Sequence, residues 1–442
     1  MKKKLLLVNP VNLKFLKFGL RQEGRIPPLA LGIIAALTPN DWDVKIVDEN
    51  FGSLDHFEAD LVGITAFTCT VARAYEIADI YRKKGVITVM GGIHASMLPE
   101  EALQYVDVVV IGEAENVWKK IITDFEAGTL QKIYKGEFEE LRNMPIPRWD
   151  LFHPEYLGAI QTTRGCPMNC AFCSVTAFNG NRYRYRPIEE VLDELERIPK
   201  KFVYFLDDNI VGHSKESEER AINLFKGIID RGIKKWWAGS ASMNFAENED
   251  VLKYAGESGC HFIMLGVEAE TSDALREINK NLNLRVIKGS YEEVFRRIHK
   301  HGIAIHGFFM YGLDLDTPET LRKRTDYIKK SGVDSISASI ACPFPGTRLY
   351  EKMREAERLR YTDFPDAWTH YHFSEVAQKP KLMEPRILED IMWKTYNQLY
   401  SRRAILFRFI RTLYVTRNPI STFMAFKYNK RMRTLNLRLF NK

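Results

Sequence analysis

The sequence predicts an α/β protein in which two parallel-sheet units are followed by a helical extension. Two observations predict this fold class. Short β-rich runs alternate with amphipathic stretches across residues 1–345, and the spacing between the runs lengthens after a proline-containing segment near residue 146. The 442 residues are 45% hydrophobic and 27% charged, which suffices for two or three domains. This composition excludes collagen-like, coiled-coil and wholly disordered chains.

The first unit, residues 1–145, is expected to be a doubly wound, Rossmann-like sheet. Its predicted strands are Lys4–Val8, Asp43–Val47, Leu61–Ala66, Val86–Met90 and Asp107–Ile111. Helical patterns at 28–38, 71–84, 99–105 and 115–126 separate these runs. In such a sheet a ligand binds beyond the carboxyl ends of the strands, where the strand order reverses.

Residues 146–157 are expected to be a linker, because Pro145 and Pro147 coincide with a loss of periodicity. Six further strands are then predicted: Ala159–Thr163, Phe202–Leu206, Trp236–Ala241, Phe262–Val267, Ala304–Met310 and Ser335–Ala341. Six βα units over 158–345 are too few for a closed eight-fold barrel and predict an open, partial one. Its functional groups should lie at the C-terminal strand ends. Residues 346–442 should form a helical extension.

The sequence also bears on the cellular compartment. No apolar run reaches the roughly 18–25 residues that a membrane-spanning helix needs. The N-terminal run Leu5–Val8 is too short for a signal peptide, so we expect a cytoplasmic protein. Six cysteines in such a chain do not indicate a disulfide framework.

Three of the six cysteines lie within eight residues, directly after the first strand of the predicted barrel. Cys166, Cys170 and Cys173 have the spacing C-x3-C-x2-C. A loop of this kind can present three thiolates to three irons of a four-iron cluster and leave the fourth iron open. The alternatives are a zinc site or incidental thiols. A structural zinc site would need a fourth Cys or His nearby, and none follows within 35 residues.

This motif, with Phe172 before the last cysteine, resembles that of the radical S-adenosylmethionine (SAM) superfamily. The resemblance extends across the six βα units. It implies that the three cysteines hold a [4Fe–4S] cluster whose open iron binds the amino and carboxyl groups of SAM. It further implies reductive cleavage of SAM to a 5′-deoxyadenosyl radical, which abstracts hydrogen from an unactivated carbon.

Polar residues at later strand ends fit SAM by the same resemblance. The candidates are Asp207, Asp208, Glu268 and Met310. The two aspartates lie where the family contacts the SAM amino group, the glutamate is suited to the ribose hydroxyls, and the methionine lies where the family packs the adenine. Each one taken singly is equally explained as a capping or turn residue. Arg276 and Lys280 are alternative carboxylate partners, but the pattern favours a solvated helix face for both.

Small and polar residues end three strands of the first unit. They are Thr65, Gly91, Gly92, His94, Gly112 and Glu113. Glycine at such positions lets the backbone approach a ligand closely. Together with the proline-containing linker, the pattern resembles the cobalamin-binding domain that precedes many radical SAM enzymes. In that domain these loops surround the nucleotide tail of the cofactor.

One feature departs from this resemblance. Many cobalamin domains carry a cobalt-ligating His after the first strand, and the segment Asn9–Lys14 has none. Either cobalamin binds without a lower protein ligand, which we favour, or the domain has kept the fold and lost the cofactor. His94 lies in the wrong loop for a cobalt ligand and is expected to line the site instead.

The C-terminal region concentrates the positive charge. Residues 401–442 hold 11 Lys or Arg and no acidic residue, whereas the other 400 residues, with 53 basic and 57 acidic side chains, carry −4. Apolar Leu406, Phe409, Ile410 and Leu413 recur at helical spacing with Arg408 and Arg411 opposite. Such a helix can pack on the barrel, lie on an anionic membrane surface or bind nucleic acid, of which the last is least favoured. The aromatic and His cluster at 368–373 is suited equally to lining a pocket and to packing.

The resemblance as a whole implies a cobalamin-dependent radical SAM enzyme that methylates an unactivated carbon of an apolar small molecule, such as a lipid or tetrapyrrole. It also implies an electron donor such as flavodoxin or ferredoxin. The group includes hopanoid and bacteriochlorophyll methylases and anaerobic porphyrin cyclases, so ring closure or oxidation stays an alternative. An RNA- or protein-modifying enzyme and a non-catalytic sensor are weaker alternatives. We expect the cluster loop to face the first sheet across a shared cavity.

Overall fold

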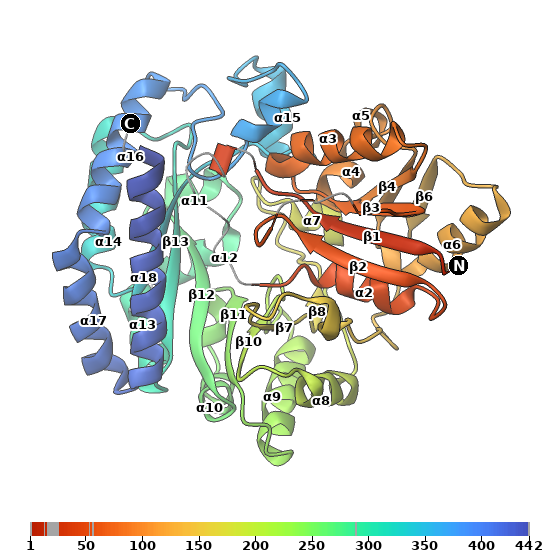
Figure 1. Ribbon diagram of the computed structural model, residues 1–442. Coiled ribbons are helices and arrows are strands. Elements are labelled where there is room, and N and C mark those ends of the chain that lie inside the picture. Colours follow the sequence, from red (N-terminus) through yellow and green to blue (C-terminus); the bar gives the residue numbers. More distant parts are fainter. Residues whose placement is uncertain are drawn as a thin grey trace.

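The computed structural model describes residues 2–12, 14–15, 26–52, 54, 57–287 and 290–440. Figure 1 shows an N-terminal sheet with its helices, a second sheet that curves beside it, and a group of C-terminal helices along the far side of the second sheet. The α/β architecture that the sequence predicts is confirmed.

The first sheet has six parallel strands in the order β2-β1-β3-β4-β5-β6. They are β1 (Lys4–Asn9), β2 (Asp43–Asp48), β3 (Leu61–Thr65), β4 (Ile87–Gly91), β5 (Val108–Gly112) and β6 (Ile133–Gly136). The helices are α2 (Leu29–Leu37), α3 (Val71–Arg82), α4 (Ile93–Met97), α5 (Pro99–Ala102) and α6 (Trp118–Ala127). The strand order reverses between β1 and β3, as in a doubly wound sheet. Strand β6 was not predicted, because its four residues carry no apolar run.

The second sheet is also parallel and six-stranded, in the order β14-β13-β12-β11-β10-β7. Its strands are β7 (Gly158–Ile160), β10 (Phe202–Phe205), β11 (Trp236–Ala241), β12 (Cys260–Glu268), β13 (Ala304–Tyr311) and β14 (Ser335–Ile340). The helices between them are α7 (Val175–Asn179), α8 (Ile188–Arg197), α9 (Lys215–Asp230), α10 (Glu249–Glu257), α11 (Ser272–Glu277), α12 (Asn281–Ile287), α13 (Tyr291–Lys300) and α14 (Pro318–Lys330). A two-stranded ribbon, β8 (Thr163–Arg164) and β9 (Arg184–Tyr185), lies beside the sheet. All six predicted strands are present.

Alternation along the barrel strands decides what covers each face. In β12, Ile263, Leu265 and Val267 pack among the helices on one side. Phe262 and Met264 point to the other side, where Ala425 of the C-terminal extension joins them in a separate cluster. Successive side chains of a strand point to opposite faces. Both faces of this strand are therefore buried, which explains its nearly continuous apolar sequence.

Helices of the C-terminal extension pack against the strands of the open barrel. It contains α15 (Arg348–Glu355), α16 (Pro385–Leu399), α17 (Arg402–Thr416) and α18 (Pro419–Phe440). Helix α18 lies against β12, β13 and β14, and the ring of Tyr428 is 4.3 Å from that of His306 on β13. Within the described ranges, no helix is both long enough and apolar enough to cross a membrane. Residues 441–442 of the basic tail lie outside the described residues.

The two sheets share a hydrophobic core. Val8 and Ile64 from the first sheet belong to one buried cluster with Leu275 of α11 and with Met353 and Trp368 of the extension. The segment expected to be a linker also packs, since a Cβ on Gly32 of α2 would meet the Phe152 ring at 2.5 Å. The boundaries at 145, 157 and 345 stay predictions.

Helix α17 is oriented opposite to what its sequence suggests. Its arginine Arg408 is buried and its guanidinium donates hydrogen bonds to the Leu399 carbonyl (2.5 Å) and to Asn429 Oδ1 (3.1 Å). Arg411 donates to the carbonyl oxygens of Gly332 and Val333. The arginines expected on a solvated face therefore hold the helix against the protein. Leu406, Phe407, Ile410, Leu413 and Tyr414 are left facing outward, whereas Ile405 is buried.

This orientation predicts opposite effects for two substitutions in α17. Arg408→Met should lower the free energy of unfolding by about 2–3 kcal/mol, because it strands two buried acceptors. Leu406→Ser, at a side chain 57% exposed, should change it by less than about 0.5 kcal/mol. Denaturant unfolding monitored by circular dichroism checks both. A larger loss for Leu406→Ser would contradict the inverted orientation.

Candidate functional site

A cavity of about 370 Å³ lies at the C-terminal ends of the barrel strands. The side chains around it come from the three-cysteine loop, from β11 to β14 and from the extension. They include Cys166, Cys170, Cys173, Asp208, Ser240, Met264, Glu268, Lys280, Phe308, Met310, Ser339, Phe344 and Phe373. One wall thus carries the three thiols and several charged groups, whereas the remainder is largely apolar. The barrel places its functional groups where the sequence predicts.

The three-cysteine loop is fixed by contacts on both sides. Gly165 has φ +86°, and a Cβ there would clash with the carbonyl oxygen of Arg182, so the turn before Cys166 requires glycine. The amide of Ala171 donates to the Ile278 carbonyl at 2.9 Å. Asn279 Nδ2 donates to the Asn169 carbonyl at 2.8 Å. The loop therefore presents its thiols in one conformation.

The thiols fit a metal cluster by their chemistry. Burial raises the pKa of all three, to about 12 for Cys173. Burial disfavours the thiolate form of these cysteines. To become thiolates they need a compensating positive charge nearby, which iron supplies. Across the described part of the chain, no three His, Cys, Asp or Glu side chains are placed to hold one metal ion. In a four-iron cluster, by contrast, each thiolate binds a different iron.

Lys280 lies inside the cavity, so the solvated-face interpretation is wrong for this residue. Its Nζ is 3.2 Å from Glu268 Oε1, and its side chain is 16% exposed. Burial alone would lower the pKa of Lys280, but Glu268 and the nearby thiols outweigh burial and leave the pKa raised. Arg276 is exposed and paired with Asp273 at 2.7 Å, as expected. The pattern predicted a solvated face because it assumed that the helix continues through Lys280. Helix α11 ends at Glu277, so Lys280 does not share the outward face of Arg276.

The two aspartates after β10 differ in their surroundings. Asp207 is buried and accepts hydrogen bonds from the amides of Thr162 and Thr163 (2.6 and 2.9 Å) and from the Thr162 hydroxyl (2.7 Å). It fixes the chain that leads into the cysteine loop and does not line the cavity. Asp208 does line it, and accepts from the Gly165 amide at 3.0 Å. A SAM contact stays a prediction for both, and Asp208 has the access for it.

Two further predicted SAM contacts lie on adjacent strands. Glu268 ends β12 in a left-handed conformation, φ +65°, beside an irregularity in its pairing with β13. Met310 on β13 also lines the cavity, and Arg324 Nη1 donates to its carbonyl at 2.6 Å. Arg324 is itself buried between Asp316 and Glu270, with N–O distances of 2.9 and 2.8 Å. Both strand ends are therefore held in place from outside the cavity.

His213 is a neighbour of the cluster loop that sequence reasoning missed. Its Nε2 is 3.7 Å from Cys166 Sγ and 2.9 Å from Asn209 Nδ2. Burial lowers the pKa of His213 to about 4, so the ring is neutral near pH 7. A lone histidine 40 residues beyond the motif gives no spacing signal that could have identified it.

The predicted cobalamin contacts of the first unit fall into two groups. Thr65, Gly91 and Gly112 end β3, β4 and β5 at one edge of the sheet, and Gly92 follows β4. A Cβ on Gly91 would make only an ordinary contact, with Val110 Cβ at 3.8 Å, whereas a Cβ on Gly112 would clash with the Gly136 carbonyl oxygen at 2.5 Å. The contact of these positions with cobalamin stays a prediction.

His94 and Glu113 are engaged with the protein. His94 is buried, its Nε2 is 3.1 Å from Glu101 Oε1, and its ring packs edge-on against Trp368. Glu101 also accepts a hydrogen bond from Trp368 Nε1 at 3.0 Å. Trp368 of the 368–373 cluster therefore packs, whereas Phe373 of the same cluster lines the cavity. A ligand-lining role for His94 and Glu113 stays a prediction.

The segment after β1 contacts the extension. Asn12 Nδ2 donates to the Thr369 carbonyl at 3.1 Å, and Lys14 Nζ is 2.7 Å from Glu375 Oε2. Leu13, in the place where a cobalt-ligating motif would be, lies outside the described residues. The extension thus covers the start of the segment that lacks the histidine.

Charged residues join the first unit to the cysteine loop. Arg164, two residues before Cys166, is 2.5 Å from Glu115 and 3.3 Å from Glu113. Glu113 also pairs with Arg184 of β9 at 2.5 Å. All four side chains are at most 14% exposed. Two cations and two anions therefore neutralise one another at the boundary between the units.

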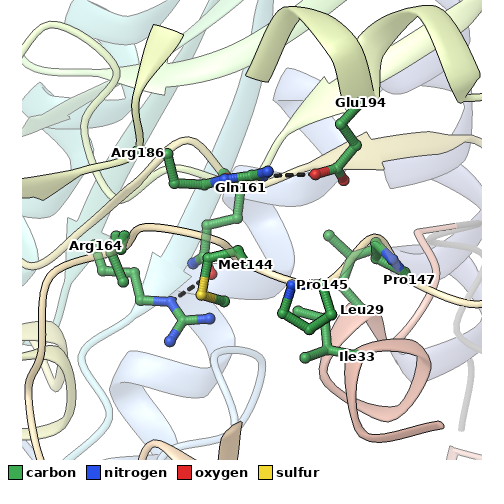
Figure 2. A pocket seen from close by; sticks show the side chains of 10 residues that line it. Leu29, Ile33, Met144, Pro145, Pro147, Gln161, Arg164, Arg186 and Glu194 are labelled. Carbon is green, nitrogen blue, oxygen red and sulfur yellow. Dashed lines mark hydrogen bonds and ion pairs between the residues drawn. The ribbon is translucent and has the colours of Figure 1, made fainter. Parts of the chain in front are cut away.

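Figure 2 shows the side chains between the two units next to these charged residues. Arg164 Nε donates to Gln161 Oε1 at 2.8 Å, and Arg186 pairs with Glu194 at 2.6 Å. Prolines 145 and 147, together with Leu29 and Ile33 of α2, leave a space of only about 20 Å³, which is room for one water. The side chains around the larger cavity all come from residues 166–373. A cavity that the two units share in front of the cysteine loop stays a prediction.

Protein-family models match both units. The B12 binding domain model matches residues 19–122, and the Radical SAM superfamily model matches residues 160–328. The second match contains the cysteine loop and the ends of β10, β12 and β13. The two matches agree with the resemblances that the motifs carry.

Named relatives extend over most of the chain. The bacteriochlorophyllide d C-12(1)-methyltransferase of Chlorobaculum tepidum is 33% identical over an aligned length of 398 residues, and the alignment covers 86% of this chain and 84% of that protein. The hopanoid C-2 methylase of Rhodopseudomonas palustris is 28% identical, over 76% of this chain and 66% of its own length. The cobalamin-dependent SAM radical enzyme OxsB, with aqua-cobalamin and SAM bound, has the same fold. Its TM-score is 0.72 at 16% identity, over 98% of this chain and 71% of that chain.

The charge network predicts a double-mutant outcome. Arg164→Met should lower stability by about 3–5 kcal/mol, because it leaves Glu115 buried without its partner. Adding Glu115→Gln removes the stranded charge and should recover more than half of that loss. Thermal unfolding of the holoprotein measures both. Additive losses in the double variant would show that the two residues are not coupled.

Proposed function

Because the chain belongs to the cobalamin-dependent radical SAM methyltransferases, we propose that it methylates an unactivated carbon of an apolar small molecule, a tetrapyrrole or a lipid. The cofactors of this family are a [4Fe–4S] cluster, SAM and cobalamin. One observation carries the substrate proposal: a single cavity combines the three thiols with a largely apolar wall.

We assign the cluster to Cys166, Cys170 and Cys173. When bound, the cluster and SAM supply a hydrogen-abstracting radical, and cobalamin supplies the methyl group. Asp208 offers an acceptor to the ammonium of SAM, which has only donors. Lys280 offers its ammonium to a carboxylate in the same cavity, and Glu268 holds that ammonium in place at 3.2 Å. The apolar wall keeps water from the reacting carbon.

The apolar wall supports the substrate class. Phe344 and Phe373 pack edge to face at 5.3 Å, and Phe373 is 56% exposed at the cavity. Two relatives are named for a bacteriochlorophyllide and for a hopanoid, which are an aromatic macrocycle and an apolar lipid. Exposed aromatic rings at a cavity suit either kind of molecule, because each offers flat or apolar surface to bury. Ring closure or oxidation of the same molecules is the second candidate, since a relative is named for it.

The proposal includes two partners. A one-electron donor such as flavodoxin or ferredoxin is required, because cleavage of SAM by the cluster is reductive. Peripheral contact with a membrane through residues 402–442 suits an apolar substrate, and the outward apolar residues of α17 support it.

Metal and product analysis tests the reaction. The wild-type chain, purified anaerobically from cells supplied with cobalamin, should carry about four irons and about one cobalamin. A Cys166→Ala, Cys170→Ala, Cys173→Ala variant should lose the iron and all turnover. Cys260→Ala, a buried cysteine of β12 outside the loop, is the matched control and should keep both. The product should gain the mass of one CH₂, and a loss of two hydrogens would instead establish ring closure or oxidation.

The aromatic wall gives a separate prediction. Phe373→Ala should raise KM for the apolar substrate roughly 10-fold or more, because the burial of a Phe side chain contributes about 1.5–3 kcal/mol. Iron content and the uncoupled cleavage of SAM should stay at wild-type levels. Ile229→Ala, exposed on α9, is the control. An unchanged KM would remove Phe373 from the substrate site.

A further inference from the structure

The outward face of α17 is apolar, and no other part of the described chain covers it. Its exposed apolar residues are Leu406 (57% exposed), Phe407 (63%), Ile410 (60%), Leu413 (42%) and Tyr414 (82%). They recur at helical spacing and form one continuous stripe. Below we call these five residues the α17 stripe. A row of large apolar side chains on a surface marks an interaction site.

The buried side of the same helix explains why the stripe points outward. Arg408, Thr412 and Thr416 face the protein and are at most 6% exposed. Thr412 donates to Asp334 Oδ1 at 2.8 Å, and Arg411 Nη2 is 3.3 Å from the same oxygen. Turning the helix over would break these bonds and leave the buried acceptors facing apolar side chains. The polar contacts therefore hold the stripe in its exposed position.

The charged residues that flank the stripe along the C-terminal chain are basic. Arg402 and Arg403 lie at the start of α17 and Arg417 directly after its end, and all three are exposed. Lys427 and Lys430 of α18 are exposed as well. Residues 401–442 contain no acidic side chain. An apolar helix face flanked by cations is complementary to the surface of an anionic bilayer.

The same charges disfavour a second copy of the chain as the occupant. A two-fold contact presents the same patch from both subunits. Whether the two helices run parallel or antiparallel, the arginines at the ends of one stripe would approach those of the other. Without acidic partners in this region, such a contact places like charges together.

We propose that the α17 stripe docks on the anionic leaflet of a lipid membrane. Helix α17 lies parallel to the membrane plane, with the five stripe residues among the acyl chains and Arg402, Arg403 and Arg417 at the headgroups. The inference specifies which helix face and which kind of lipid make the membrane contact. It rests on the proposed function only for the reason that such a contact exists, namely that an apolar substrate is held in that membrane.

Vesicle sedimentation tests the proposal on the full-length holoenzyme, without substrate or reductant. The wild-type chain should bind vesicles of phosphatidylcholine with one quarter phosphatidylglycerol at least 10-fold more tightly than vesicles of phosphatidylcholine alone. A rise in salt from 0.1 to 0.5 M should weaken this binding, because salt screens exposed charges.

Two variants separate the contributions. Phe407→Ser, Ile410→Ser, Tyr414→Ser should lose at least 10-fold in binding while keeping wild-type unfolding and cofactor content. Arg402→Glu, Arg403→Glu, Arg417→Glu should lose the preference for anionic vesicles. Leu382→Ser, an exposed apolar residue outside the extension helices, should bind like the wild type.

Three outcomes would overturn the proposal. The first is equal binding of the wild type to both kinds of vesicle, and the second is unchanged vesicle binding by the serine variant. The third is that the wild type forms a concentration-dependent dimer and does not bind vesicles, and that the serine variant no longer forms this dimer. Because no turnover is measured, failure of the methylation proposal leaves this result intact. Methylation of detergent-dispersed substrate by the serine variant would likewise leave the reaction established if vesicle binding failed.

Discussion

The pairing of Arg164 with Glu115 and Glu113 is the constraint on which the arrangement of the two units depends. Arg164 lies two residues before the first cluster cysteine, and both glutamates follow the fifth strand of the B12-binding unit. A displacement of either loop would leave a charge buried without a partner, which costs several kcal/mol. The ends of the two sheets are thereby held at one separation. Cofactors held in different units would need such a fixed separation to act on one substrate.

A second group of buried charges lies inside the cavity and has a different consequence. Lys280 is the cation nearest the thiols, and Glu268 is its direct partner. An ammonium in a site of low dielectric interacts more strongly with anions than it would in water. The cavity therefore has a positive group already in place beside the thiolates. Met and Phe side chains line the same cavity and give it a largely apolar surface.

The sequence predicted the fold well because parallel strands buried on both faces leave continuous apolar runs, which were read correctly in both sheets. The spacing of the three cysteines was enough to predict a cluster site. The prediction of a solvated position for Lys280 was wrong because the chain leaves the helix before this residue, and Asn279 has a left-handed backbone conformation. An amphipathic pattern does not reveal a change of backbone conformation of this kind. The loop position of His94 predicts a lining role, which stays a prediction, but the sequence does not show that its ring packs against Trp368 from a distant segment. Contacts between segments far apart in the chain set these roles.

Helix α17 shows the same limit in its sharpest form. A helical wheel separates its apolar residues from Arg408 and Arg411, but it cannot say which face meets the protein. The usual assumption buries the apolar face. Here the neighbouring surface offers Asp334, Asn429 and three carbonyl oxygens, and these acceptors are satisfied only by the polar face. An unpaired buried acceptor costs about 1–3 kcal/mol, which is comparable with what burial of one large apolar side chain contributes, so several unpaired acceptors would offset the gain from burying the stripe. The exposed stripe is therefore a consequence of the polar surface beneath it, and a membrane is a surrounding in which both faces of the helix are satisfied.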